Sequence, residues 1–174
     1  MAIPIEIDVW QGDIAELEVD AIVVPAHESL FMTSAVARAV KRRAGDGVER
    51  DAVRQGPMPA GSAVVTAGGS LAAPYVIHAI AVGHDLVADA GRLAAALDEA
   101  FSVATRLGLR RLAMPPLGAE RGVFGVGEAI AQLLAVVERR AAAAQPLPAS
   151  LVIAAGSPAE ATAIRAALPV GFAG

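Results

Sequence analysis

The chain has 174 residues, of which 55% are hydrophobic and 18% are charged, which suits one domain with a substantial core and excludes intrinsic disorder. It contains no cysteine, so disulfide frameworks, thiolate zinc sites and a cysteine nucleophile are excluded. The net charge of −4 argues against sequence-independent binding of nucleic acid, because such binding needs a basic surface.

The first residues predict an edge strand. Residues 3–10, IPIEIDVW, alternate apolar and polar side chains, as expected of a strand with one covered face. The segment lacks the basic stretch and apolar run of a secretory signal, so we expect a cytoplasmic location. The next strand, at 21–26, is a continuous apolar run of the kind that is buried on both faces.

A helix is predicted at 34–44, where Val36 and Val40 lie on one face. Its end reads KRRAG, residues 41–45. This group is either a local basic patch or the solvated end of a helix, where cations interact favourably with the helix dipole. The second interpretation is the simpler one.

No Lys, Arg, Asp or Glu occurs between Arg54 and Asp85, a stretch long enough to cross a bilayer. Prolines and glycines interrupt it, however, as they do in turns. The stretch therefore predicts two buried strands, at 62–67 and 75–82, and no contact with a membrane.

The second half of the chain alternates helices and strands in the same way. Leu93, Leu97 and Phe101 recur at helical spacing, and Gly108 is a suitable stop for that helix. A strand at 109–116, a helix at 127–144, a strand at 149–155 and a helix at 158–168 complete the pattern. Helices between buried strands predict a single domain, residues 1–174, of the three-layer α/β/α sandwich class.

One loop stands out at the carboxyl end of the strand at 109–116, where ligands bind in such folds. Glycines occur at 118, 122, 125 and 127, and Phe124 lies among them. The backbone N–H groups could bind phosphate while the ring covers a sugar or base. The alternative is a glycine-rich turn with a core phenylalanine, and spacing alone favours neither. The loop is neither a Walker loop nor a dinucleotide fingerprint.

Several segments together resemble the macro domain family over nearly the whole chain. The most specific are GDI at 12–14, VDAIV at 19–23, PYVIHAI at 74–80 and GVFG at 122–125. The resemblance implies a mixed, roughly six-stranded sheet between helices. It also implies a cleft that binds ADP-ribose or a related adenine nucleotide without a cofactor. Several members of the family remove ADP-ribosyl groups from proteins, so an ADP-ribosylated protein is a further possible partner.

The resemblance also assigns ligand contacts. Asp13 would accept a hydrogen bond from the exocyclic amine of adenine, with the Ile14 backbone beside it. The alternative for Asp13 is a cap on the turn after the first strand. The distal phosphate and ribose would be held by the loop residues Gly118, Ala119, Arg121, Gly122, Val123, Phe124 and Gly125.

The opening of the predicted cleft departs from the family pattern. Where members usually carry NAAN, this chain reads VPAH, so His27 replaces the final asparagine. The glycine run that wraps the diphosphate corresponds to Thr33, Ser34 and Ala35, followed by Val36. The aspartate common in hydrolases corresponds to Ala37.

These changes alter the predicted chemistry. Thr33 or Ser34 could still cap the helix and leave its N-terminus electropositive toward a phosphate. Ala37 removes the obvious carboxylate for activating water. His27 is either a substitute base or, more simply, a hydrogen-bonded structural residue.

Two further features accompany the departure. The second loop is two residues longer than usual, and the extra pair is assigned to Glu120 and Arg121, with Arg121 either contacting phosphate or pairing with Glu120. His78 lies in a predicted strand and is expected in the core, whereas His84 is expected in a loop. The three histidines have no metal-ligand spacing.

We therefore expect a macro-domain-like protein that binds ADP-ribose, or a related adenine diphosphate nucleotide, without efficient hydrolysis. Three alternatives stand beside this interpretation: an ADP-ribosyl hydrolase that uses His27, a degenerate module that acts in protein–protein contact, and recognition of RNA or poly(ADP-ribose), which the negative net charge disfavours.

Overall fold

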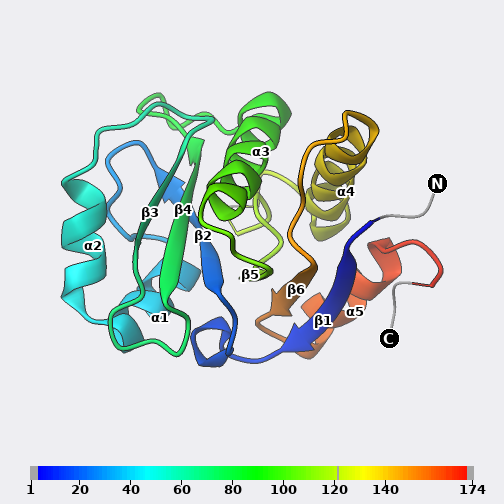
Figure 1. Ribbon diagram of the computed structural model, residues 1–174, viewed down its shortest axis with the longest axis horizontal. Coiled ribbons are helices and arrows are strands. Elements are labelled where there is room, and N and C mark those ends of the chain that lie inside the picture. The colour runs from blue at the N-terminus through cyan, green and yellow to red at the C-terminus, as the bar shows by residue number, and fades with distance from the viewer. Residues whose placement is uncertain (1–3, 121, 172–174) are drawn as a thin grey trace.

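Six strands form one mixed sheet, with helices on both faces, in the computed structural model, which describes residues 4–120 and 122–171 (Figure 1). Along the chain the elements are β1 (Glu6–Gln11), the 3-10 turn η1 (Ile14–Glu16), β2 (Ala21–His27), α1 (Ala35–Ala44), α2 (Asp46–Val53), β3 (Ala63–Ala67), β4 (Tyr75–Val82), α3 (Ala90–Arg106), β5 (Arg111–Met114), α4 (Val126–Ala142), β6 (Ser150–Ala155) and α5 (Pro158–Ala167).

The strand order is β1-β6-β5-β2-β4-β3. The first five strands in this order run parallel to their neighbours, and only β3 runs antiparallel, to β4 at the far edge. The carboxyl ends of five strands therefore meet at one edge of the sheet, where ligands bind in open α/β folds.

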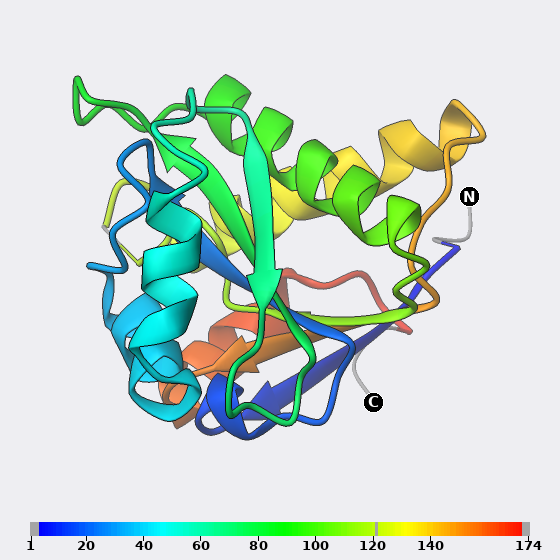
Figure 2. The same cartoon turned by 60° about the vertical axis from the view of Figure 1, so that its left-hand side comes forward.

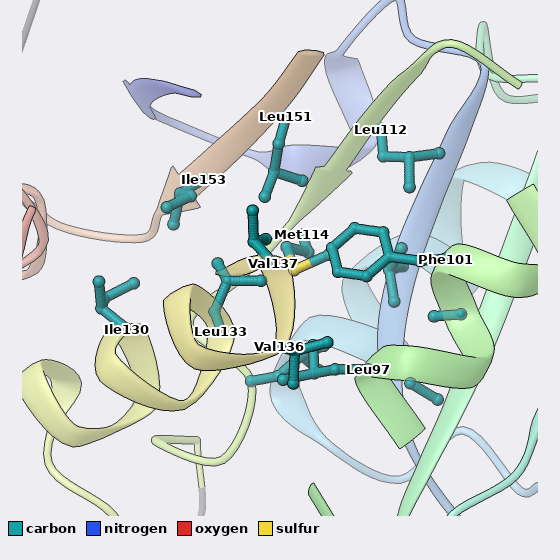
Figure 3. Packing of buried hydrophobic residues seen from close by; sticks show 14 of the residues in the cluster. Leu97, Phe101, Leu112, Met114, Ile130, Leu133, Val136, Val137, Leu151 and Ile153 are labelled. Carbon is teal, nitrogen blue, oxygen red and sulfur yellow. The ribbon is translucent and has the colours of Figure 1, made fainter. Parts of the chain in front are cut away.

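One face of the sheet is covered by α3, α4 and α5. Figure 3 shows Leu97 and Phe101 of α3 and Val137 of α4 packed near Leu112 of β5 and Ile153 of β6. Phe101 is fully buried, as expected for the largest side chain of this cluster.

The other face is covered by η1, α1 and α2, which Figure 2 shows on the opposite side of the sheet from α3 and α4. Val40 of α1 and Val48 of α2 pack in one cluster with Ile22 and Val24 of β2. The apolar residues of β2 alternate between the two clusters, which explains why its sequence shows no polar face.

All six predicted strands and all four predicted helices are present. The position of β1 at the edge of the sheet is confirmed, and so are the two strands between Arg54 and Asp85. The predicted strand at 109–116 was too long, because Pro115 and Pro116 cannot continue the ladder and β5 ends at Met114. No helix within the described ranges is long and apolar enough to span a bilayer.

The helix α2 was not predicted. It begins directly after Gly45, which ends α1 with a φ of 97° and gives α2 no side-chain cap. Only Val48 and Ala52 are buried in its eight residues. Such a short helix lacks the repeated apolar spacing and the capping side chain on which sequence-based prediction depends.

His78 is a core histidine, as predicted. It is 1% exposed, and its Nε2 lies 3.1 Å from Oγ1 of Thr66 on β3. Burial lowers the pKa of His78 to about 4. The ring is therefore neutral in the folded protein at a pH at which the unfolded chain takes up a proton.

We predict that this difference makes the protein less stable as the pH falls from about 6.5 to about 4. Unfolding releases a histidine of ordinary pKa, so protonation favours the unfolded state and should lower the free energy of unfolding by about 1–2 kcal/mol between pH 7 and pH 5. Urea denaturation across this range measures the loss. His78→Gln, which cannot titrate, should lose less stability on acidification. Equal pH slopes in the two proteins would show that His78 does not cause the effect.

Candidate functional site

Two adjacent cavities lie at the carboxyl ends of the parallel strands. We call them the β1–β6 cavity and the β2–β4 cavity, and their volumes are about 500 Å³ and 280 Å³. The β1–β6 cavity is lined by Gly12, Asp13, Ile14, Ala35, Val36, Ala39, Arg42, Pro115, Ala154, Gly156 and Glu160. The β2–β4 cavity is lined by Pro25, Ala26, His27, Phe31, Thr33, Ser34, Ala35, Val82 and Glu120.

The two cavities share Ala35, the first residue of α1. Ser34 caps the helix, because its Oγ accepts a hydrogen bond of 3.1 Å from the N–H of Ala37. This confirms the predicted capping of α1 by a hydroxyl. Ser34 has a φ of −68°, so its backbone needs no glycine. The electropositive end of α1 therefore lies at the junction of the two cavities.

Asp13 follows β1 and caps η1 while it lines the β1–β6 cavity. Its Oδ1 accepts a hydrogen bond of 3.0 Å from the N–H of Ala15. Its Oδ2 lies 3.8 Å from Nη1 of Arg43, which is 2.8 Å from Oε1 of Glu16. The predicted capping role is confirmed, and the predicted contact with adenine is compatible with it because Asp13 also lines the cavity.

Gly12 positions this carboxylate. Its φ is 151°, and a Cβ there would come within 2.5 Å of the ring of Trp10. A side chain at this position would therefore displace the tryptophan or the turn that carries Asp13.

His27 ends β2, at an irregularity in the pairing of β2 with β4. Its Nδ1 accepts a hydrogen bond of 3.1 Å from the N–H of Ser29 and lies 3.0 Å from Oγ of Ser29. This confirms His27 as a hydrogen-bonded structural residue, although it also lines the β2–β4 cavity. Since Nδ1 is an acceptor, the neutral ring carries its proton on Nε2. The ring of His84 contacts it edge-on, with centroids 5.3 Å apart, from the predicted loop.

Glu28, which sequence reasoning missed, joins three loops beside this cavity. Its carboxylate accepts hydrogen bonds from the N–H groups of Ala60, at 3.1 Å, and His84, at 3.0 Å. These two donors lower the pKa of the Glu28 carboxyl. The carboxylate therefore fixes the loop after β2 to the loops before β3 and after β4. No local pattern reveals such a role, because the partners are 32 and 56 residues away.

Glu49 of α2 has a similar role and was also missed. It accepts hydrogen bonds from the N–H of Met32, at 2.8 Å, and from Nζ of Lys41, at 2.7 Å. The bond from Lys41 is the main cause of the lowered pKa of the Glu49 carboxyl. The unpredicted helix α2 thus holds the segment that leads into α1.

The loop between β5 and α4 uses many of its backbone donors internally. The N–H of Gly118 donates to Oε2 of Glu120 at 2.8 Å, and the N–H of Gly125 donates to Oε2 of Glu128 at 3.0 Å. The N–H groups of Ala119, Gly122 and Phe124 donate to carbonyl oxygens of the same loop. A phosphate that used these donors would have to replace existing hydrogen bonds.

Phe124 packs against the apolar cluster beneath α3 and α4. A Cβ at Gly118, whose φ is 100°, would lie 2.9 Å from the Phe124 ring. This arrangement favours the core phenylalanine over a ring that covers a sugar. Val123 is 51% exposed on the same loop. Arg121, the predicted phosphate contact, lies outside the described residues.

The two cavities bring together several of the residues of the predicted site. Of the predicted contacts, the two cavities include Asp13, Ile14, His27, Thr33, Ser34, Ala35 and Val36. From the described part of the β5–α4 loop they include Pro115 and Glu120 but none of its glycines. Among the described residues, no three histidines or carboxylates converge as a metal site would require.

Comparison with known proteins identifies the family. The family model described as Macro domain matches residues 23–133. An uncharacterized protein of Aeropyrum pernix is 36% identical over 124 residues, a match that covers 69% of this chain and 64% of that protein. The chain thus spans slightly less than two thirds of that relative. A macro domain-containing protein of Cupriavidus necator is 37% identical over 148 residues, covering 80% of this chain and 84% of that protein.

Solved structures agree on the fold. A Trypanosoma brucei macrodomain in complex with ADP superposes with a TM-score of 0.82 at 21% identity, covering 94% of this chain and 69% of that chain. The T. brucei macrodomain in complex with ADP-ribose superposes with a TM-score of 0.80 at 21% identity, covering 91% and 67%. Because the family model spans more than half of the sequence and the relatives exceed 30% identity over most of it, the chain belongs to the macro domain family.

Proposed function

We propose that the protein binds ADP-ribose or a related adenine nucleotide with a diphosphate. The observation that carries this proposal is the junction of two cavities at the N-terminus of α1. A helix N-terminus favours a phosphate group, and the cavities on either side provide separate space for a base and for a distal sugar. The base would lie in the β1–β6 cavity beside Asp13, and the distal ribose in the β2–β4 cavity.

The solved T. brucei macrodomain complexes with ADP and with ADP-ribose support this ligand class. In this chain, the diphosphate would depend on α1. The N–H groups of Ala35 and Val36 begin the helix and have no acceptor within it, whereas the N–H of Ala37 is capped. The open cavities favour a bound ligand over a degenerate module with a closed cleft.

Binding without efficient hydrolysis remains the favoured activity. Ala37 is 1% exposed and offers no carboxylate to the cavity. His27 has its Nδ1 engaged by Ser29. A hydrolase remains the second candidate, because His27 and the carboxylate-bearing Glu120 line the same cavity.

Three broader statements belong to the same proposal. The single domain would span residues 1–174, the protein would act in the cytoplasm, and its ligand could be free or attached to an ADP-ribosylated protein.

The role of Asp13 gives a direct test. Asp13→Asn can still accept the hydrogen bond from Ala15 but loses the carboxylate that would accept from the adenine amine. We expect ADP-ribose binding to weaken by about 1–3 kcal/mol, with little change in thermal stability. Calorimetric titration measures the affinity, and Asp13→Ala, which also loses the cap, serves as the comparison. The parent protein should bind poorly the analogue of ADP-ribose in which inosine replaces adenosine. If it binds both nucleotides equally, Asp13 does not read the amine.

The role of His27 separates binding from catalysis. We expect no measurable release of ADP-ribose from a modified protein by the parent chain, because the carboxylate usual in hydrolases is missing. We expect His27→Ala to retain ADP-ribose binding. The matched control is His84→Ala, which removes the adjacent ring that is not among the residues lining either cavity. Turnover by the parent that is lost in His27→Ala and kept in His84→Ala would instead make His27 a general base.

A further inference from the structure

Three consecutive cations end α1, but the structure separates them. Nζ of Lys41 lies 2.7 Å from Oε1 of Glu49, and Nη1 of Arg43 lies 2.8 Å from Oε1 of Glu16. Within residues 4–120 and 122–171, Arg42 has neither a hydrogen bond nor an ion pair from its side chain, and it lines the β1–β6 cavity. The interpretation of residues 41–45 as a solvated helix end thus does not account for Arg42, an exposed arginine that lines a cavity.

The position of Arg42 along α1 indicates which part of a ligand it meets. Ala35, Ala39 and Arg42 recur at helical spacing and line the same cavity. Seven residues separate Ala35 from Arg42, which corresponds to about 10 Å along the helix axis. The neighbouring Arg43 reaches the Asp13 carboxylate. Arg42 therefore lies toward the Asp13 end of the cavity, away from the helix N-terminus that would bind the diphosphate.

Among residues 4–120 and 122–171, the residues that line this cavity include no aromatic side chain on which a base could stack. The apolar members of this lining are Ile14, Ala35, Val36, Ala39, Pro115 and Ala154. Trp10, the only tryptophan of the chain, lies against Gly12 but is not among the lining residues. Among the described residues that line the cavity, Arg42 is the one with a planar cationic side chain, and guanidinium groups stack on the faces of nucleobases.

We propose that the Arg42 guanidinium stacks on the purine ring of the bound nucleotide. This inference rests on the proposed function and adds a base-recognition residue to it. Asp13 would specify which purine is bound, through the exocyclic group. Arg42 would raise affinity for either purine, because stacking depends on the face of the ring and not on its edge.

The experiment compares Arg42→Ala with Arg38→Ala for three ligands: adenosine, AMP and ADP-ribose. Arg38 lies one turn earlier on α1, is exposed and is not among the residues lining either cavity, so its loss removes the same charge without the contact. We expect Arg42→Ala to weaken binding of each ligand by a similar factor, about 3- to 10-fold. Arg38→Ala should bind like the parent. Calorimetric titration supplies the dissociation constants.

One further variant, Arg42→Lys, separates stacking from charge. Arg42→Lys keeps the charge but loses the planar group, so it should remain weakened. Arg42→Ala should also keep the preference for adenine over hypoxanthine, which Asp13→Asn should lose.

Three outcomes would overturn the inference. The dissociation constants of Arg42→Ala could match those of the parent, or they could rise only as much as those of Arg38→Ala. The loss of affinity in Arg42→Ala could instead be larger for ADP-ribose than for adenosine, and Arg42→Lys could bind as tightly as the parent. That result would indicate a phosphate contact. If the parent binds none of the three ligands, the proposed function fails and this inference fails with it. If the parent binds them and an Arg42 variant binds them equally well, only this inference fails.

Discussion

The burial of β2 on both faces is the constraint on which the rest of the fold depends. Residues Ala21, Ile22, Val23 and Val24 are all 0% exposed. Such a strand is stable only if helices cover both sides of the sheet and other strands pair with both its edges. β5 and β4 supply the pairing, while α3 and α1 belong to the two apolar clusters on either side. The parallel pairing then places the end of β2 beside the ends of its neighbours.

The site follows from where the chain goes after β2. It leaves the sheet at His27, crosses the edge and enters α1 at Ala35, so the N-terminus of that helix lies between two cavities. Long-range hydrogen bonds to Glu28 and Glu49 hold this crossing in place. At the start of α1 the Ser34 hydroxyl caps the helix, and the backbone of Ser34 has an ordinary negative φ.

The two ends of α1 have different electrostatic roles. The N-terminus is electropositive through its backbone N–H groups, and the last turn carries Lys41, Arg42 and Arg43, whose charges oppose the negative end of the dipole. A ligand in the β1–β6 cavity would therefore lie along a helix with favourable groups for an anion at one end and for a base at the other. In the β5–α4 loop, the N–H groups of Gly118 and Gly125 already donate to the carboxylates of Glu120 and Glu128.

The sequence by itself determined the sheet, most of the helices and the local caps. Apolar periodicity is a property of a few consecutive residues, so β2, β4 and α3 could be predicted from the sequence. The caps by Asp13 and Ser34 are equally local, since each side chain bonds a backbone group two or three residues away.

Only the tertiary structure decided which of these residues meet. It separated Arg42 from the paired Lys41 and Arg43, and it packed Phe124 against the core. It also gave Glu28 partners 32 and 56 residues away. These features depend on the distances between segments that are remote in the chain, and no spacing within one segment encodes them.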